Sequence, residues 1–412
     1  ENIINEIEGK IPTFNKMLLN RTKFKEAAAW FEKNMPEKYS AALAAQGYTN
    51  LPNDLSKEAV SLLYGGIPKG SISRAELFNK CRYAYFLRYG LFAAEREKHN
   101  IEPRNAGSFM HEIIDEFSKY ASEIGWNEFT KTVCNKKVAE ITKSVLEKYL
   151  GDIYTSTARF NYITKKIVRI MSTTAWSISE FYKRSHFVPL GYEIAFDKDG
   201  EFPPIEVEAG GSKIILRGKV DRADILRTEN GNYVSIVDYK SSYKNINYAE
   251  ILCGVQIQLP TYIKAVCEAI SQKEGVRTMP AAMLYYRFDM PIISADRNIS
   301  DEDILQSVKK SLKMKGLTLE AEKIDDEIST VFAVKSPATS QQIDKICKTA
   351  YSKLKDAFSQ ILNGRIDINP VRISGEDACV YCPYGSVCGF DISLPGNKYR
   401  NIKKISGEEF FD

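Results

Sequence analysis

The chain has 412 residues, of which 44% are hydrophobic and 27% charged, and its formal net charge is +4. This composition excludes a disordered, collagen-like or low-complexity chain, and the length predicts two or three structural units. Apolar runs end well before the roughly 18 residues of a transmembrane helix, and no secretory signal is visible, so no membrane partner is expected. Eight cysteines without such a signal predict a reducing, cytoplasmic location, where grouped cysteines are typical of metal or cluster ligands.

Changes in residue spacing divide the chain into successive stretches. Residues up to Gly70 have helical spacing, whereas β-branched residues dominate after about residue 185 and predict strands. A helix is expected from about Val255 to Ile270, and the strand AAMLYYRF follows it. We therefore expect a helical lead-in at 1–70, a helical segment at 71–185, a core sheet at 186–298, a helical region at 299–372 and a cysteine-rich tail at 373–412.

Two carboxylates and a lysine are predicted to converge on a β-hairpin. Asn230-Gly231 is a favoured two-residue turn, which would place Asp221 opposite Lys240. Asp238 lies on the same face, two residues before Lys240. Carboxylates suit Mg²⁺, and a neighbouring lysine would stabilise charge on a phosphate during hydrolysis. A surface hairpin with a cross-strand salt bridge is the alternative that this stretch leaves open.

Three further polar residues flank this hairpin in the sequence. His111 is one of only three histidines and follows Gly107 at the start of a helix expected from about Phe109 to Ile124. Gln258 and Tyr262 are four residues apart, so they share one face of the predicted helix. Taken singly, each has an ordinary explanation: a structural histidine, a solvated glutamine and a core tyrosine.

Together these motifs resemble the RecB-type nucleases, a branch of the PD-(D/E)XK nucleases. That family has a metal-binding His after a Gly, then G-x-x-D, D-x-K and Q-x-x-x-Y, which read here GSFMH, GKVD, DYK and QLPTY. The resemblance implies an α/β fold with a central mixed sheet flanked by helices, and Mg²⁺ as the metal, with Mn²⁺ or Ca²⁺ as alternatives. It implies metal binding by His111, Asp221, Asp238 and the main-chain carbonyl of Tyr239, catalysis by Asp221, Asp238 and Lys240, an accessory role for Gln258 and Tyr262, and a possible added carboxylate at Glu193.

Four cysteines frame these motifs. Cys379, Cys382 and Cys388 form C-x2-C-x5-C in the tail, and Cys81, far earlier in the chain, is the candidate fourth ligand. The spacing alone leaves zinc, an iron–sulfur cluster and unligated thiols open. One cysteine before the nuclease motifs and three after them resembles the iron–sulfur members of the family. That resemblance implies a [4Fe–4S] cluster that ties the tail to the N-terminal side of the domain.

The phrase SISRAELFNKCRYAYFLRYGL is most similar to the C-terminal nuclease domain of AddB-type subunits of bacterial AddAB helicase–nucleases. Those subunits are far longer and carry a helicase-like region. We therefore expect this chain to be an excised nuclease domain, with residues 1–70 as a remnant of the region before it. The sequence contains no G-x-x-x-x-G-K-[ST] motif, so ATP binding through a P-loop is not expected.

The resemblance implies a metal-dependent deoxyribonuclease that acts on single-stranded DNA. In the full complex it would cut the 5′-terminated strand during double-strand-break end resection for recombinational repair, with an AddA-type helicase–nuclease subunit as its partner. Two alternatives stay open: a DNA-binding and assembly module with little activity alone, and a stand-alone CRISPR-type iron–sulfur exonuclease. The apolar side of residues 1–70 is the expected partner surface.

Overall fold

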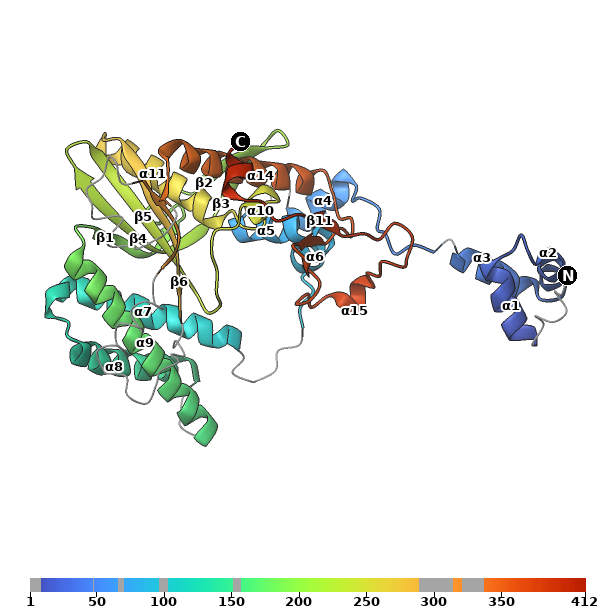
Figure 1. Ribbon diagram of the computed structural model, residues 1–412, viewed down its shortest axis with the longest axis horizontal. Helices are drawn as coiled ribbons and strands as arrows, with labels where there is room; N and C mark the ends of the chain where they lie inside the picture. The colour runs from blue at the N-terminus through green and yellow to red at the C-terminus, as the bar shows by residue number, and fades with distance from the viewer. Residues whose placement is uncertain are drawn as a thin grey trace.

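A six-stranded mixed sheet forms the centre of the molecule (Figure 1). The computed structural model describes residues 9–46, 48–65, 70–95, 103–150, 157–288, 314–320 and 337–412. The strands are, in order across the sheet, β1 (Val188–Phe196), β4 (Gly218–Thr228), β5 (Gly231–Lys240), β6 (Thr278–Arg287), β7 (Lys315–Leu319) and β8 (Pro337–Ala338). The β5–β6 and β7–β8 pairs are parallel and the other three are antiparallel.

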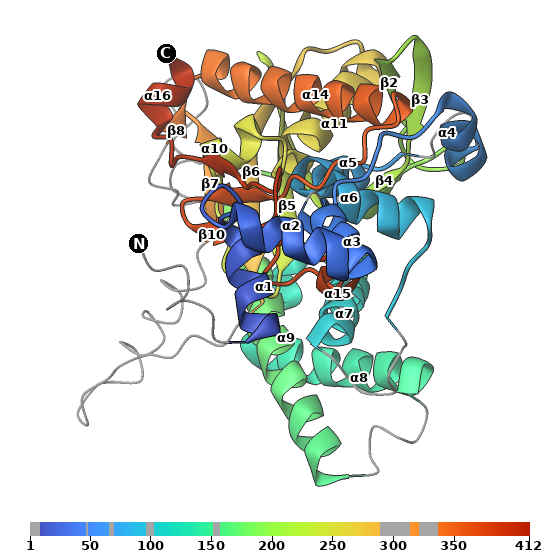
Figure 2. The ribbon, with the colours of Figure 1, turned by 90° about the vertical axis from the view of Figure 1, so that its right-hand side faces the viewer.

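Helices cover both faces of this sheet. Both views place α7 (Pro103–Ile124), α8 (Lys131–Leu150) and α9 (Ala158–Arg184) on one side, and α11 (Gln258–Glu274) and α14 (Ser340–Leu362) on the other (Figure 1 and Figure 2). β5 is therefore buried from Gly231 to Tyr239, as expected for a strand covered on two faces. The expected α/β architecture, a central mixed sheet flanked by helices, is confirmed.

Residues before and after α5 (Ile72–Lys80) pack against the C-terminal part of the chain. Arg82 Nη1 lies 2.7 Å from Asp367 Oδ1, and the Asn50 side chain donates a 3.0 Å hydrogen bond to the carbonyl oxygen of Cys388. These contacts join segments that lie about 300 residues apart in the chain. The elements involved are α4 (Lys57–Tyr64), α5 (Ile72–Lys80), α6 (Arg82–Tyr85), the π-helical turn Phe86–Gly90, β9 (Val371–Ile373), β10 (Glu376–Asp377), α15 (Gly385–Cys388) and β11 (Arg400–Ile402).

Three short N-terminal helices form a small core of their own, which stands apart from the sheet in Figure 1. They are α1 (Lys10–Leu19), α2 (Lys25–Asn34) and α3 (Pro36–Gln46), packed around Met17, Phe24, Phe31 and Tyr39. The remaining described elements are β2 (Ile205–Ala209), β3 (Ser212–Leu216), the 3₁₀ turn Trp126–Glu128, α10 (Tyr248–Leu252) and α16 (Gly407–Phe411). Among the helices that the structure describes, none has the length and apolar character needed to cross a bilayer.

The β4–β5 hairpin differs from the expected one. Thr228 pairs with Gly231, so the two-residue turn lies one residue earlier than expected. The register therefore moves by two residues, and continuing the ladder sets Asp221 opposite Asp238 rather than Lys240. Gly231 has a φ of 130°, and an added Cβ would lie 2.7 Å from a main-chain carbonyl oxygen, so this glycine is required in the strand. Because the shift is even, every side chain keeps its predicted face.

Two other sequence expectations need correction. The region 299–372 is not wholly helical, because β7 and β8 add two strands at the sheet edge; residues 299–313 and 321–336 lie outside the described residues. β7 is short and flanked by charged residues, so its strand character comes from pairing with β6 rather than from local pattern. The helix that carries His111 begins at Pro103, which places His111 in the third turn rather than the first.

Candidate functional site

Acidic residues form a row across three neighbouring strands. In the β1–β4 ladder, the residues on either side of Glu193 pair with those on either side of Asp221, so these two carboxylates lie opposite each other. The β4–β5 ladder, continued by one residue, places Asp238 opposite Asp221 on the third strand. Residues that pair across strands point to the same face. Glu193, Asp221 and Asp238 therefore occupy one level of the sheet.

His111 completes a compact group with two of these carboxylates. From α7, its Nδ1 lies 3.4 Å from Oδ2 of Asp221. Ligand atoms of His111, Glu193 and Asp221 all lie within 4.8 Å of one another, and each of the three residues is partly exposed. One imidazole nitrogen and two carboxylate oxygens are a donor set that suits a divalent cation. The residues present therefore fit a metal ion that solvent and substrate could also reach.

The surroundings of His111 favour its protonated form when no cation is bound. Burial lowers the pKa of His111, but the hydrogen bond and charge of Asp221, helped by the charge of Glu193, outweigh burial, and the net pKa is raised. The rings of Tyr239 and Phe288 stand edge-on to the imidazole, with centroids 5.9 and 5.3 Å away. These contacts orient the ring. A cation bound here would have to displace the proton.

Asp238 and Lys240 form an ion pair beside this group. Lys240 Nζ lies 2.6 Å from Asp238 Oδ2, and the lysine side chain remains partly exposed. Burial raises the pKa of the Asp238 carboxyl, which the charge of Lys240 lowers and that of Asp221 raises further. The main-chain N–H of Tyr239 donates a 2.8 Å hydrogen bond to Asp221 Oδ2 and so fixes that carboxylate. Asp238 itself lies outside the compact group, and metal binding by it and by the Tyr239 carbonyl stays a prediction.

From the sequence, Glu193 was predicted only as a possible additional carboxylate of the site. The structure places it inside the compact group. Its φ is +52°, a left-handed conformation that non-glycine residues rarely adopt. The ladder of β1 also shifts register between Pro189 and Gly191. Such local strain and bulges are common where a side chain is re-aimed toward a functional site. Lys219 pairs with the Glu193 carboxylate.

Tyr262 has a packing role that links two motifs. Its buried hydroxyl accepts a 3.2 Å hydrogen bond from the main-chain N–H of Lys219, and burial raises the pKa of Tyr262 to about 12. An added Cβ on Gly218 would collide with the Tyr262 ring, so the Gly of G-x-x-D and the Tyr of Q-x-x-x-Y fit each other. Gln258 is the first residue of α11, on the same helix face as Tyr262.

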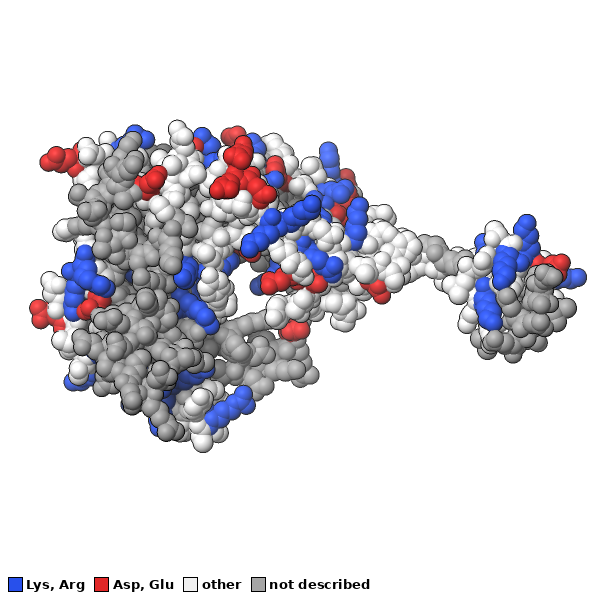
Figure 3. Space-filling view, viewed as in Figure 1, with Lys and Arg blue, Asp and Glu red and all other residues white. Residues whose placement is uncertain are grey.

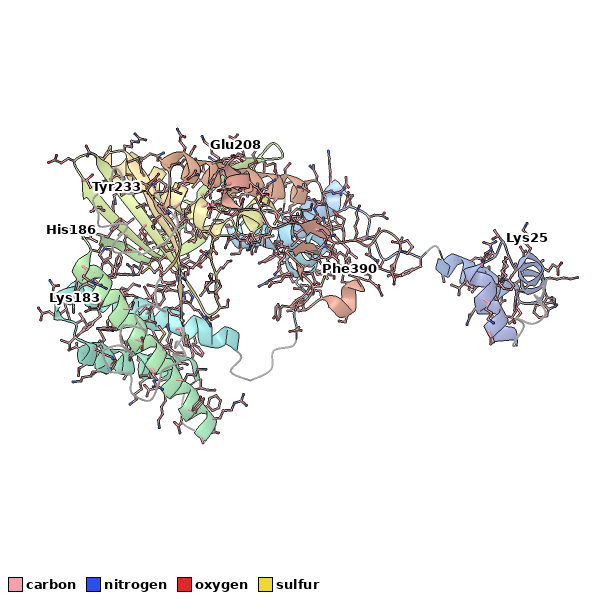
Figure 4. The ribbon with its side chains drawn as sticks, in the orientation of Figure 1. Lys25, Lys183, His186, Glu208, Tyr233 and Phe390 are labelled. Atoms are coloured by element: carbon pink, nitrogen blue, oxygen red, sulfur yellow. The ribbon has the colours of Figure 1, made fainter. Side chains whose placement is uncertain are left out.

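The four predicted cluster cysteines line one cavity of about 480 Å³. It lies between α5, α6 and the C-terminal tail, and Figure 4 marks its lining residue Phe390 at this end of the molecule. Burial raises the pKa of Cys379 to about 11, and burial also raises the pKa values of Cys81 and Cys388. Thiolates rather than thiols bind metals, so a bound group would have to displace these protons. The other four cysteines are Cys134, Cys267 and Cys347, which are buried in the main core, and the partly exposed Cys253.

Residues 69–389 match the PD-(D/E)XK nuclease superfamily. Because this match covers more than half of the chain and includes every motif residue described above, the chain belongs to that superfamily. The match, together with the mixed sheet, confirms the family that the sequence motifs indicated.

Several curated relatives are named as one subunit, the B-type, of an ATP-dependent helicase/deoxyribonuclease. The protein of Clostridium novyi (strain NT) is 33% identical, over 100% of this chain and 39% of the relative. The protein of Clostridium acetobutylicum is 33% identical over 98% of this chain and 38% of the relative. That of Acetivibrio thermocellus is 34% identical over 94% of this chain and 36% of the relative. The chain thus spans less than two fifths of the length of these relatives.

Proposed function

We propose that this chain is the metal-dependent deoxyribonuclease domain of a helicase–nuclease subunit and that it hydrolyses single-stranded DNA. The observation that carries this proposal is the row of Glu193, Asp221 and Asp238, with His111 and Lys240 beside it. In the full-length assembly, acting in the cytoplasm, it would cut the 5′-terminated strand during end resection for recombinational repair. The names of the relatives support this assignment.

The side chains divide the chemistry between them. His111, Glu193 and Asp221 would hold the ion, with Asp238 as a further carboxylate. A bound Mg²⁺, or Mn²⁺ or Ca²⁺ in its place, would supply Lewis acidity to the phosphodiester and to the attacking water. Lys240, partly exposed and next to Asp238, places a positive charge where negative charge gathers on the phosphate oxygens in the transition state.

The surface of α9 supports a nucleic-acid substrate. No acidic residue occurs between residues 157 and 179, and this stretch exposes Arg159, Lys165, Lys166 and Arg169 beside Tyr162, whose side chain is 68% exposed. None of these four cations forms an ion pair with another described residue. They extend over about 15 Å of helix. Figure 3 shows basic side chains on the part of the molecule where α8 and α9 lie. Charge with an exposed aromatic ring suits single-strand binding without sequence preference.

The cysteine cavity supports a [4Fe–4S] cluster over zinc. Tetrahedral zinc with Zn–S bonds of about 2.3 Å would hold the four sulfur atoms about 3.8 Å apart. Among the residues that the structure describes, no three cysteines have sulfur atoms within 4.8 Å of one another, although all four line the same cavity. We infer that Cys81, Cys379, Cys382 and Cys388 ligate the larger cluster and thereby join the tail to α5.

The N-terminal helices support a protein partner. Leu19 is 88% exposed and Trp30 45% exposed on the small helical unit that stands apart from the sheet. Exposed large apolar side chains on such a unit are typical of a surface that another chain covers. We propose that this surface faces the remainder of a longer chain or an AddA-type helicase–nuclease subunit.

The test is cleavage of 5′-labelled single-stranded DNA with Mg²⁺ by anaerobically purified protein. Asp238→Ala and Lys240→Ala should each lower kcat at least about a thousandfold. The first removes a carboxylate that would help to hold the ion, and the second removes the positive charge beside the phosphate. Lys348→Ala is the matched control, since Lys348 pairs with Asp344 on the distant surface of α14 and should leave kcat unchanged. Absorbance near 400 nm with iron analysis reports the cluster.

Each outcome separates the parts of the proposal. An inactive wild type would overturn the nuclease assignment and favour an assembly module. Equal loss in all three variants would show that the assay reports folding rather than chemistry. An active, colourless protein that contains zinc would keep the nuclease and contradict the iron–sulfur assignment.

A further inference from the structure

Glu76 is a carboxylate that the proposed chemistry does not use. It lies in α5, and its Oε1 accepts hydrogen bonds from the main-chain N–H groups of Ile257 at 2.8 Å and Gln258 at 3.0 Å. These amides begin α11. The N-cap residue of that helix is Ile257, which has no side chain able to accept them. Glu76 therefore caps α11 from a different part of the chain.

The same helix also holds the turn that precedes α11. Asn79, one turn after Glu76, donates a 3.0 Å hydrogen bond to the carbonyl oxygen of Gly254. Gly254 has a φ of 77°, and an added Cβ would collide with the Asn79 side chain. Only glycine allows this close approach. Two adjacent turns of α5 thus fix both ends of the segment from Gly254 to Gln258.

The other end of α5 reaches the cysteine cavity. Cys81 is the C-terminal cap residue of α5 and lines the cavity. Arg400, from the C-terminal tail, donates hydrogen bonds to the carbonyl oxygens of Asn79 and Asn369. A single nine-residue helix therefore connects the cavity to the start of α11.

The charged neighbours of Glu76 are lysines close to the candidate functional site. Burial raises the pKa of the Glu76 carboxyl, whereas Lys244, the two α11 amides and Lys240 lower it. Lys240 is also the ion-pair partner of Asp238. A negative charge at the start of α11 is favourable for the helix dipole as well as for these lysines. Glu76 is thus within electrostatic reach of Lys240, the ion-pair partner of Asp238.

We propose that Glu76 is a positioning residue: it fixes the first turn of α11, and with it Gln258, relative to Lys240, and it makes this position depend on the cysteine-bearing helix α5. The inference rests on the proposed nuclease function for its kinetic consequence. Its structural consequence, a coupling between the cysteine cavity and the start of α11, can be measured without any activity.

The kinetic test compares Glu76→Ala and Glu76→Gln in the full chain. We expect Glu76→Ala to lower kcat about tenfold while KM for single-stranded DNA and Mn²⁺ affinity stay within about threefold, because a lost cap misplaces Gln258 without touching the metal group. Glu76→Gln keeps an oxygen that can accept both amides and should recover most of kcat. Glu250→Ala is the matched control: this carboxylate is also partly buried, and it accepts from the Asn247 side chain rather than from α11.

Hydrogen exchange measured by mass spectrometry gives the second readout. Glu76→Ala should speed exchange in residues 253–262 and leave the peptide around His111 unchanged. Cys81→Ser, which removes a cluster ligand, should speed exchange in the same peptide. Adding Glu76→Ala to Cys81→Ser should then change hydrogen exchange in residues 253–262 little further, because both substitutions break the same link through α5.

The outcomes are distinguishable. Wild-type kcat in Glu76→Ala, unchanged exchange at 253–262, or fully additive effects of Glu76→Ala and Cys81→Ser would each overturn the inference. Equal losses of kcat in Glu76→Ala and Glu76→Gln, with a general fall in thermal stability, would also overturn it, because that pattern reports destabilisation. An inactive wild type would overturn the proposed function, while the exchange data would still decide the coupling.

Discussion

The two faces of β4 carry charged residues with opposite environments. On one face Asp221 is partly exposed and lies near His111. Together with Glu193 these two residues form a group that could bind a cation. On the other face, Arg222 and Asp224 are both 0% exposed and form an ion pair with a distance of 2.7 Å. Asp221 and Arg222, which are consecutive in the strand, thus lie in different environments because side chains alternate between the two faces.

The buried pair is enclosed by aromatic residues of α9. The Arg222 guanidinium lies 4.7 and 4.6 Å from the ring centroids of Phe181 and Tyr182. The Tyr182 hydroxyl donates a 2.5 Å hydrogen bond to Asp224 and accepts one from Tyr192. Every charge in this group has a partner inside the protein. On the opposite face, Glu193, Asp221 and Asp238 lie close together. Their cationic partners Lys219, His111 and Lys240 are all at least partly exposed, so a ligand can reach this group.

The largest expected effect on stability comes from breaking the buried pair. Asp224→Asn leaves the Arg222 charge without a partner in the core and should lower the free energy of unfolding by about 3–5 kcal/mol. Asp238→Asn, on the other face, removes a carboxylate whose burial already disfavours its charge and should change stability by less than about 1 kcal/mol. Urea denaturation of both variants measures the difference.

A double variant tests the cause of that loss. Replacing the pair together, Arg222→Met with Asp224→Leu, removes both charges and should recover much of the stability lost in Asp224→Asn. If Asp238→Asn were as destabilising as Asp224→Asn, the contrast between the two faces would be wrong. If the double variant were worse than Asp224→Asn, packing against α9 rather than charge would explain the loss.

The sequence predicted which residues gather on the first face better than it predicted the register that brings them together. D-x-K and G-x-x-D named Asp221, Asp238 and Lys240, and the family fixed the fold around them. The turn was wrong by one residue, because the preference of Asn-Gly for a turn is local, whereas Gly231 is needed where the strand passes close to another main chain. Because the register differs by an even number of residues, Asp221, Asp238 and Lys240 still lie on the predicted face of the hairpin.

Other features depend on long-range packing and left little local signal. Glu193 lies in the compact group with His111 and Asp221. It has a left-handed φ, and β1 shifts register between Pro189 and Gly191; a strand pattern shows neither feature. Glu76 looks like an ordinary helical glutamate until α11, some 180 residues later, supplies the amides that it caps. The buried pair Arg222–Asp224 also becomes intelligible only when α9 covers it.

The cysteine cavity is a third region, and its lining residues come from neither face of β4. Cys382→Ser should remove one ligand of the proposed cluster and lower the free energy of unfolding by about 2–4 kcal/mol, since that cluster would close a very long loop. Cys134→Ser is the control: Cys134 is a fully buried core thiol away from the cavity, so its change should cost stability without loss of iron. Iron content and thermal melting measure both effects. Full iron retention in Cys382→Ser would contradict the assigned ligand set.

The smallest expected effect is a pH dependence of stability, which should come only from the face of β4 that carries Asp221. Asp221 and Glu193 raise the pKa of His111 in the folded chain, so the metal-free fold binds a proton more tightly than the unfolded chain does. This stabilisation is present below about pH 6.5 and is lost as pH rises through the higher, folded-state pKa. It should amount to about 1 kcal/mol or less. A divalent cation needs the neutral imidazole, so its stabilising effect should grow over the same pH range.

Thermal melting between about pH 6 and pH 8, with and without Mn²⁺, measures both trends. In His111→Gln the metal-free trend and the pH dependence of the Mn²⁺ effect should both disappear. In His186→Gln they should remain, because His186 lies before β1 and outside the metal group (Figure 4). The buried Arg222–Asp224 pair should contribute nothing to this pH dependence. The guanidinium stays charged throughout the range, and solvent does not reach the pair. A Mn²⁺ effect that weakened as pH rose would mean that the ion binds without displacing the His111 proton, and the imidazole would then not be a ligand.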